Sequence, residues 1–291
     1  MKYIDEYRDR LLVENLLREI QQETTRNWSL MEICGGQTHS IMKYSLHELL
    51  TDKISLIHGP GCPVCVTPVE IIDRAVELGG DSRVILTSFG DMMRVPGTAS
   101  DLLSVRAKGG DVRIVFSPLD VLGIAEENPD KEVVFLAVGF ETTAPAVAMA
   151  ISQARKKKLD NFSILNSLVR VPPAIDALMT SDHHQIQGFL AAGHVCTVMG
   201  CQQYMELSEK YKIPIVVTGF EPVDILHGIL KAVRMLEVNS HGTENAYGRS
   251  VRAEGNRAAR KLLDRLFIFK DRKWRGIGII PDFQRPRDQV H

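Results

Sequence analysis

The strongest constraint on the fold is an alternation of short β-branched apolar runs with segments of helical period. The strand-like runs begin at residues 54, 83, 112, 132, 162, 194 and 214. Segments of helical period lie between several of these runs, at residues 69–78, 99–107, 144–157 and 223–236. Such alternation is typical of βαβ units, in which helices bury both faces of parallel strands. The sequence therefore predicts an α/β fold with doubly wound, Rossmann-like parallel sheets.

The length of 291 residues and the Gly-Pro-rich turns favour two smaller domains over one large sheet. We expect a helical segment over residues 1–50, one α/β domain over 51–130, a second over 131–240, and a long helix with an irregular tail over 241–291. The runs VVFLAVGFETTAP from Val133 and IPIVVTGFEPVDI from Ile213 each predict a strand, a Gly-Phe-Glu turn and a helix start. The two domains are therefore expected to be similar.

Composition excludes several classes of partner. The 35 Lys and Arg residues nearly balance the 36 Asp and Glu residues, so no strong field attracts nucleic acid or anionic lipid. No apolar run reaches the roughly 18 residues of a membrane span, and residues 1–22 lack the pattern of a secretory signal. We expect a cytoplasmic protein, in which the five cysteines are metal-binding, catalytic or buried rather than paired in disulfides.

The most informative segment is GPGCPVCVTP from Gly59, which places Cys62 and Cys65 between a strand and a helix. Two thiols at this spacing can form a disulfide or share a metal. If Thr67 caps the following helix, the helix dipole favours the thiolate form of both cysteines. A closed structural zinc site normally needs a second such pair, which the sequence lacks. The alternative is a tight turn that carries two cysteines without chemistry.

A second constellation, MEICGGQTH from Met31, sets Cys34 and His39 on either side of Gly35 and Gly36. The double glycine would let the backbone curl so that the thiol and the imidazole face one point. Such a pair can bind iron or act as nucleophile and base. The alternative is a half-buried cysteine next to a surface histidine.

Three further sites carry weaker signals. Glu141 in GFETTAP is a candidate acid, base or hydrogen-bond acceptor, while Thr142 or Thr143 is expected to cap the next helix. His194 in GHVC is by itself more often a satisfied core residue than a ligand. Inert packing is expected for the last two cysteines, Cys196 and Cys201. The chain also lacks a phosphate loop, a GxGxxG fingerprint, HExxH and GxSxG, which disfavours nucleotide hydrolysis, zinc proteolysis and serine hydrolysis.

Together with GHVCTVMG from Gly193 and GFEPVDIL from Gly219, these motifs, in this order, resemble HypD, the maturation factor of nickel-iron hydrogenases. The resemblance covers nearly the whole chain. It implies two similar α/β domains and a scaffold on which iron receives cyanide and carbon monoxide, as Fe(CN)2CO, before delivery to the hydrogenase large subunit. It implies an assembly factor with redox-active thiols rather than a turnover enzyme.

The resemblance also implies roles and partners. The essential thiols of the family fall on Cys34, Cys62 and Cys65, and soft thiolates suit low-spin iron. A HypC-like small chaperone would offer another cysteine to the same iron, and a HypE-like protein would donate cyanide. His39 is expected to orient the site, and Glu141, Thr142 and His194 are expected to line or support a cleft between the domains.

The family further implies a third domain with a 4Fe-4S cluster on four cysteines near the carboxyl terminus. This sequence has no cysteine after Cys201, so we expect a shortened member, a truncated product or a divergent paralogue. Gln37 also stands where many relatives would have histidine. The rival function is a stand-alone thiol oxidoreductase that uses only Cys62 and Cys65, and a third possibility is a remnant that binds partners without catalysis.

Overall fold

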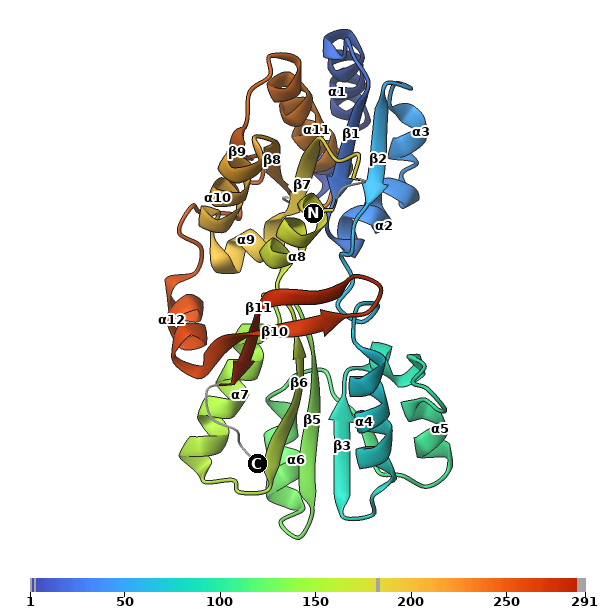
Figure 1. Cartoon of the computed structure of the whole chain (residues 1–291), viewed down its shortest axis with the longest axis vertical. Helices are drawn as coiled ribbons and strands as arrows, with labels where there is room; N and C mark the ends of the chain where they lie inside the picture. Colours follow the sequence, from blue (N-terminus) through green and yellow to red (C-terminus); the bar gives the residue numbers. More distant parts are fainter. Residues whose placement is uncertain (1, 3, 182–183, 287–291) are drawn as a thin grey trace. The chain divides into compact units, whose positions relative to one another are not determined.

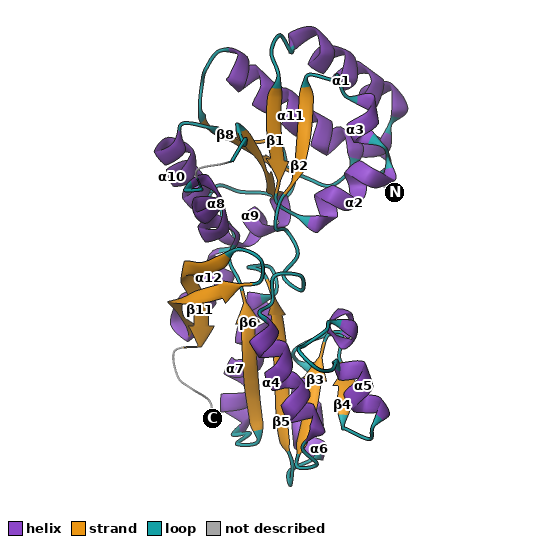
Figure 2. Cartoon of the chain, turned by 45° about the vertical axis from the view of Figure 1, so that its right-hand side comes forward, coloured by secondary structure: helices purple, strands orange, loops and turns teal. Residues whose placement is uncertain are grey.

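The computed structural model describes residue 2, residues 4–181 and residues 184–286. Two parallel sheets carry the fold, one with strand order β2-β1-β7-β8-β9 and the other with order β4-β3-β5-β6 (Figure 1). A separate antiparallel pair is formed by β10 and β11. Helices flank both parallel sheets (Figure 2). The predicted α/β class with doubly wound parallel sheets is therefore confirmed.

The chain divides into two compact units, each built from two separate stretches of sequence. The first unit comprises Met1–Cys62 and Ala174–Arg257, and the second comprises Pro63–Pro173 and Ala258–His291. This division differs from the consecutive domains that we expected, with a boundary near residue 130. Strands β3 and β5 lie on either side of that residue and pair in the same sheet, with Val84 opposite Glu132. The polar stretch at 126–132 connects helix α6 to strand β5 within the second unit.

In the first unit, the sheet is covered by a long helix that is itself covered by another. Its strands are β1 (Trp28–Glu32), β2 (Ile54–His58), β7 (Gly188–Ala192), β8 (Pro214–Thr218) and β9 (Gly242–Asn245). Its helices are η1 (Asp5–Arg8), α1 (Arg10–Glu23), α2 (Gly35–Lys43), α3 (Leu46–Leu49), α9 (Gly193–Met199), α10 (Gln202–Tyr211) and α11 (Pro222–Glu237). Helix α11 buries Ile225, Ile229 and Val233 against the sheet residues Leu190 and Val216, and α1 packs on α11. This core fixes the strands whose carboxyl ends carry the candidate site.

In the second unit, helices again pack against a buried parallel sheet. Its strands are β3 (Val84–Ser88), β4 (Val112–Ile114), β5 (Glu132–Gly139), β6 (Phe162–Leu168), β10 (Phe267–Trp274) and β11 (Gly278–Pro286). Its helices are α4 (Val69–Gly80), η2 (Gly90–Arg94), α5 (Leu102–Ala107), α6 (Asp120–Glu127), α7 (Ala144–Lys157) and, apart from its first residue, α12 (Arg257–Leu266). Helix α8 (Val171–Met179) begins in this unit and ends in the first. Strand β5 is buried over seven of its eight residues, as expected of a central parallel strand. Among all described residues, no helix is long and apolar enough to cross a membrane.

Two sequence predictions of secondary structure are wrong. The run from residue 194, predicted as a strand, is helix α9, and the strand is the preceding segment β7. A Cβ atom on Gly193 would lie 2.4 Å from the carbonyl oxygen of Thr218, so only glycine lets the chain pass over the end of β8. The long helix predicted over 243–266 is instead strand β9, a turn with Gly255 at φ +66° and helix α12.

The two ends of the chain also differ from expectation. The segment 1–50, predicted as helical, contains strand β1, which pairs with β2 and β7 inside the sheet. The tail from residue 281, predicted to be irregular, continues strand β11 to Pro286, and residues 287–291 lie outside the described part. Strand β1 depends on pairing with β7, which is distant in sequence, and β11 depends on its hairpin partner β10, whose polar residues do not signal a strand.

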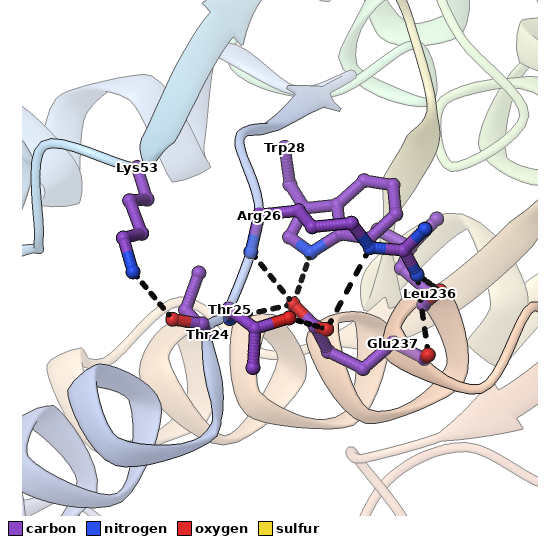
Figure 3. Close-up of polar contacts among 7 residues, drawn as sticks. All are labelled: Thr24, Thr25, Arg26, Trp28, Lys53, Leu236 and Glu237. Carbon is purple, nitrogen blue, oxygen red and sulfur yellow. Dashed lines mark hydrogen bonds and ion pairs between the residues drawn. The ribbon is translucent and has the colours of Figure 1, made fainter.

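A carboxylate at the end of α11 fixes the loop that enters β1 (Figure 3). Glu237 accepts hydrogen bonds from the backbone N–H of Thr25 at 2.8 Å and from the indole Nε1 of Trp28 at 2.7 Å. The hydroxyl of Thr25 also donates to Glu237. Because these donors favour the ionised form, the pKa of Glu237 falls to about 2. The carboxylate thus holds the first residue of β1 against α11.

Candidate functional site

Cys34 lies two residues after the end of β1, at the carboxyl end of the first unit's sheet. It is the N-cap residue of α2, and its Sγ accepts a hydrogen bond from the backbone N–H of Gly36 at 3.4 Å. The side chain is buried. Burial raises the pKa of the Cys34 thiol, and hydrogen bonds from the helix start oppose this rise only in part. The unmetallated site therefore holds Cys34 as a thiol.

The imidazole next to Cys34 belongs to His194. Its Nε2 lies 3.9 Å from the Sγ of Cys34, and its Nδ1 is buried without a hydrogen-bond partner. Because β1 and β7 are parallel neighbours, the residues that follow them meet at the same edge of the sheet. Burial lowers the pKa of His194, which favours the neutral imidazole. A thiol and a neutral imidazole therefore face each other in the first unit.

His39, the histidine that we expected beside Cys34, lies on the exposed side of α2. Gly35 and Gly36 do not curl the backbone around a shared point but form the first turn of that helix. The amide of Gln37 donates a 2.7 Å hydrogen bond to the hydroxyl of Thr218, while its Oε1 is buried and unpartnered. The predicted pairing of Cys34 with His39 is therefore wrong, and the histidine that lies near the thiol comes from another strand end.

The loop before Cys62 packs backbone to backbone against Cys34. The N–H of Gly35 donates to the carbonyl oxygen of Gly61 at 3.1 Å. A Cβ atom on Gly61 would lie 2.5 Å from the Cα of Cys34, and one on Gly59 would lie 2.7 Å from the carbonyl oxygen of Glu32. The two glycines are therefore required for this close approach. Cys62 follows Gly61 directly and is half-buried, so its loop lies beside Cys34 within the first unit.

The environment of Cys65 differs from that of Cys34 and Cys62. Cys65 belongs to the second unit and is exposed. It lies in a turn before α4, and the expected cap from Thr67 is absent: the Thr67 hydroxyl donates instead to the carbonyl oxygen of Pro63 at 2.8 Å. The backbone N–H of Arg275 donates to Val66 at 2.9 Å, so the turn between β10 and β11 supports the turn that carries Cys65.

A buried carboxylate that sequence reasoning missed organises the first unit's site. Glu32 is fully buried at the end of β1, and its Oε2 accepts a hydrogen bond from the backbone N–H of Cys34 at 3.0 Å. Its Oε1 lies 2.7 Å from the Nδ1 of His58 and also accepts from the hydroxyl of Thr38. The available signal was a lone acidic residue in an apolar run two positions before Cys34.

Two aromatic rings, those of Phe220 and Tyr247, form a cluster that packs against the ring of His194. The ring centroid of Phe220 lies 5.0 Å from that of His194, and a Cβ atom on Gly36 would lie 3.1 Å from the Phe220 ring. Tyr247 meets Phe220 edge to face, with the centroids 6.4 Å apart. Phe220 therefore packs against both the histidine and the helix start that hold the thiol.

The last ring of this cluster, Tyr247, packs against the guanidinium of Arg249. The guanidinium of Arg249 lies 4.4 Å from the ring centroid of Tyr247 and 3.5 Å from that of Tyr7. Both of its terminal nitrogens donate to the buried carboxylate of Asp224, at 2.5 and 2.6 Å. This bidentate pair locks the orientation of the guanidinium. The sequence predicted no role at the site for Arg249, Tyr247 or Asp224.

In the second unit, Glu141 is a buried carboxyl group with one oxygen in use. It follows β5, and its Oε1 accepts a hydrogen bond from the backbone N–H of Val171, the first residue of α8, at 2.9 Å. Its Oε2 is buried without a partner. Burial raises the pKa of Glu141 to about 7, although the charge of Arg170 opposes the rise. Glu141 therefore titrates near neutral pH.

The threonines after Glu141 do not behave as predicted. Thr143 occupies the N-cap position of α7 but makes no side-chain capping bond. A Cβ atom on Gly139 would lie 2.4 Å from the Cβ of Thr143, so the threonine covers this glycine. Thr142 is half-buried beside it.

The described side chains do not form a closed metal site. Within the described residues, no group of three or more His, Cys, Asp or Glu side chains is placed to hold a metal ion. The five cysteines also do not gather for a four-thiolate cluster, because Cys65 belongs to the second unit and, among the described residues, no three of the others come together. The first unit can present a buried thiol, a neutral imidazole and a neighbouring cysteine loop to an incoming soft metal or electrophile.

Fold and site together define a parallel α/β protein with cysteine loops at strand ends, suited to metal or redox chemistry on thiols. The family model HypD, described as the hydrogenase formation hypA family, matches residues 11–285. The chain belongs to this family of hydrogenase maturation factors, as its motifs predicted.

Several curated relatives are similar over almost the whole chain. The hydrogenase expression/formation protein HupD of Azotobacter chroococcum mcd 1 is 43% identical over 290 residues, covering 97% of this chain and 76% of the relative. The hydrogenase maturation factor HypD of Azotobacter vinelandii is 42% identical, covering 97% and 77%. HypD of Escherichia coli strain K12 is 39% identical over 307 residues, covering 100% and 82%.

Proposed function

We propose that the chain is a scaffold on which the Fe(CN)2CO group of a nickel-iron hydrogenase is assembled, with iron held by the thiolates of Cys34, Cys62 and Cys65. The observation that carries this proposal is the packing of Gly61 against Cys34, with a 3.1 Å hydrogen bond from Gly35 to Gly61. That packing brings the loop of Cys62 beside the backbone of Cys34. Cys65 follows three residues further along the chain.

The chemistry of the first unit supports a site in which Cys34 becomes a thiolate only when a metal binds. A buried thiol with a raised pKa resists oxidation and alkylation until a soft metal displaces its proton. Low-spin iron with strong-field ligands is such a metal, and it enters as cargo rather than as a resident cofactor. Glu32 holds the backbone of Cys34, and His194, which packs against Phe220, lies beside the Sγ of Cys34.

The partners follow from the same proposal. A HypC-like chaperone supplies a further cysteine to the iron, a HypE-like protein donates cyanide, and the finished group passes to the hydrogenase large subunit in the cytoplasm. A net charge of −1 gives no general attraction to nucleic acid. The four-cysteine cluster of the family has no role in this proposal.

The rival function is a thiol oxidoreductase that uses Cys62 and Cys65 without iron. The exposure of Cys65 favours it, because a dithiol reductant must reach its substrate. This rival makes Cys34 structural. It predicts disulfide reduction by the iron-free protein, with no change on substitution of Cys34.

Iron analysis and infrared spectroscopy of the anaerobically purified complex with the HypC-like partner test the proposal. We expect bound iron and bands from cyanide and carbon monoxide in the natural protein, and loss of both in Cys34→Ala. Cys201→Ser serves as the control, because Cys201 lies outside the iron site, and it should retain the bands. Full iron retention in Cys34→Ala would overturn the assignment. Dithiol reductase activity without iron, unaffected by Cys34→Ala, would favour the rival.

A further inference from the structure

The ring of Phe220 borders the thiol of Cys34. Phe220 follows β8 and is half-buried, and it lies next to the first turn of α2. A Cβ atom on Gly36 would lie 3.1 Å from the ring of Phe220 and 3.6 Å from the Sγ of Cys34. A single methyl group at that point would therefore touch both the ring and the sulfur.

Two other groups enclose the same thiol. The Nε2 of His194 lies 3.9 Å from the Sγ of Cys34, and the ring centroid of His194 lies 5.0 Å from that of Phe220. The loop of Gly61 packs on the backbone of Cys34, where a Cβ atom on Gly61 would lie 2.5 Å from the Cα of the cysteine. The aromatic ring, the imidazole and this loop together account for the burial of the thiol.

The main chain on both sides of Phe220 is held in place. A Cβ atom on Gly219 would lie 2.6 Å from the Cε2 of Tyr247, so only glycine lets the chain pass this ring. Glu221 forms a reciprocal capping box with Asp224 at the start of α11, and its N–H donates to the carboxylate of Asp224 at 3.2 Å. Phe220 therefore lies between two fixed positions.

The N-terminal segment fastens the same region. Arg8 donates to both carboxylate oxygens of Glu221, at 2.5 and 2.9 Å. The ring centroid of Tyr7 lies 3.5 Å from the guanidinium of Arg249, which also packs on Tyr247. Bidentate pairs of this kind favour one orientation. The ring beside the thiol thus belongs to a rigid assembly.

Filling the core does not account for the position of Phe220. Ile225 and Leu226, which follow it in α11, are fully buried in the core of the unit. Phe220 keeps part of its surface in solvent, and its ring meets the imidazole of His194 at an angle of 47°. A half-buried ring that also faces the thiol borders the approach from solvent to the sulfur.

We propose that Phe220 selects by size what reaches Cys34, so that compact reactants are admitted and bulky ones are excluded. The inference rests on the proposed function in one respect. It makes iron with small ligands, such as water or diatomic molecules, the natural reactant of the thiol, and it excludes iron in a bulky chelate. The test uses alkylation of the thiol and needs neither iron nor a partner protein. Its failure is therefore distinguishable from failure of the proposed function.

Two alkylating reagents with the same reactive carbon measure the selection. Iodoacetamide is compact, and N-benzyl-iodoacetamide carries an additional ring. In both reactions the sulfur attacks the carbon, a C–S bond forms, and iodide leaves while the thiol proton passes to the buffer. Because both reagents react with the same thiolate, the ratio of their rates at one cysteine does not depend on its ionisation.

The reduced full-length protein is treated with each reagent for a series of times, quenched with excess thiol, denatured and digested with trypsin. The peptide from Asn27 to Lys43 reports on Cys34, and fragment ions of the peptide from Ile54 to Arg74 report on Cys65. Cys65 is exposed and serves as the internal reference.

We expect Cys34 of the natural protein to favour the compact reagent on the order of tenfold more than Cys65 does, because the additional ring cannot pass a packed aromatic side chain without displacing it. Phe220→Ala should lower the preference at Cys34 to that of Cys65, and Phe220→Leu should give an intermediate value. The same preference at Cys34 in the natural protein and in Phe220→Ala would overturn the proposal.

A core variant separates selection by Phe220 from general loosening of the unit. Leu230→Ala removes a buried side chain from the middle of α11. It should keep the preference that Cys34 has in the natural protein. If Leu230→Ala loses the preference as Phe220→Ala does, loosening explains both variants and the proposal falls.

Discussion

The Sγ of Cys34 lies 3.9 Å from the Nε2 of His194, although 160 residues separate them in the chain. The two residues follow β1 and β7, which pair in parallel with Leu30 opposite Gly188. Phe220, which packs on His194, follows β8, the next strand of the same sheet. Three motifs that look unrelated in sequence are therefore consecutive positions along one edge of a parallel sheet. This edge is where α/β folds collect their chemistry.

Replacing His194 should weaken the retention of iron. Because His194 touches Cys34 and orients its side chain, His194→Ala is expected to lower the affinity for iron about tenfold, as for other residues that support a metal ligand. His47→Ala is a suitable control, since His47 is an exposed histidine of the same unit. Iron content of the anaerobic complex with the HypC-like partner is the measurement. Equal iron content in both variants would show that the imidazole only fills space.

Secondary structure was predicted correctly where the residue pattern of the segment itself determines it. The prediction failed where pairing with a strand distant in sequence determines it. Helix α7 begins at Ala144 and ends at Lys157, as predicted, because its apolar positions repeat at helical spacing. The segment Val195–Val198 was mistaken for a strand because it is β-branched, whereas the true strand β7 is built from glycine, alanine, leucine and phenylalanine. There, pairing with β1 and β8 overrides intrinsic preference.

The candidate site shows the same limit. The cysteine motifs singled out Cys34 and Cys62, and the glycines around them signalled the close approach that the structure contains. The sequence could not identify which histidine meets Cys34, because that depends on strand order. Glu32 was missed because a single acidic residue at a strand end looks like an exposed one until its hydrogen bonds are known.

Adding one methyl group at Gly61 should disturb the site. The new Cβ in Gly61→Ala would lie 2.5 Å from the Cα of Cys34, so one of the two loops must move. We expect a loss of about 1–3 kcal/mol in the free energy of unfolding and a matching loss of bound iron. Gly123→Ala is the matched control, because that glycine is inside helix α6 with open space around it. Urea denaturation should show the Gly123→Ala protein to be as stable as the natural protein or more stable by up to about 1 kcal/mol. A Gly61→Ala protein as stable as this control would refute the close packing.

Glu141 should make the second unit less stable as pH rises. Its pKa is raised from 4.5 to about 7, so the folded state binds a proton that the unfolded state has already released between these values. Stability is therefore highest below pH 4.5 for this group and falls as pH rises through about 7.

Glu141→Gln removes this dependence while keeping an oxygen to accept the hydrogen bond from Val171. Between about pH 5 and pH 8 the variant should gain up to about 3 kcal/mol relative to the natural protein. Urea denaturation at the two pH values, followed by a signal from the second unit, is the measurement. Parallel stability curves for the two proteins would mean that the buried oxygen of Glu141 is solvated.

Glu237 should have the opposite dependence on pH. Its pKa is lowered from 4.5 to about 2 by the donors from Thr25 and Trp28, so the ionised form stabilises the fold. The stabilisation is present above pH 4.5 and is lost as pH falls through about 2. Glu237→Gln should therefore be less stable by about 2 kcal/mol at neutral pH, since bonds to a charged acceptor are stronger than bonds to an amide. In urea denaturation at a series of pH values, the stabilities of the two proteins should converge as pH falls toward about 2. A constant difference at every pH would show that the amide of the variant destabilises the fold for steric reasons instead.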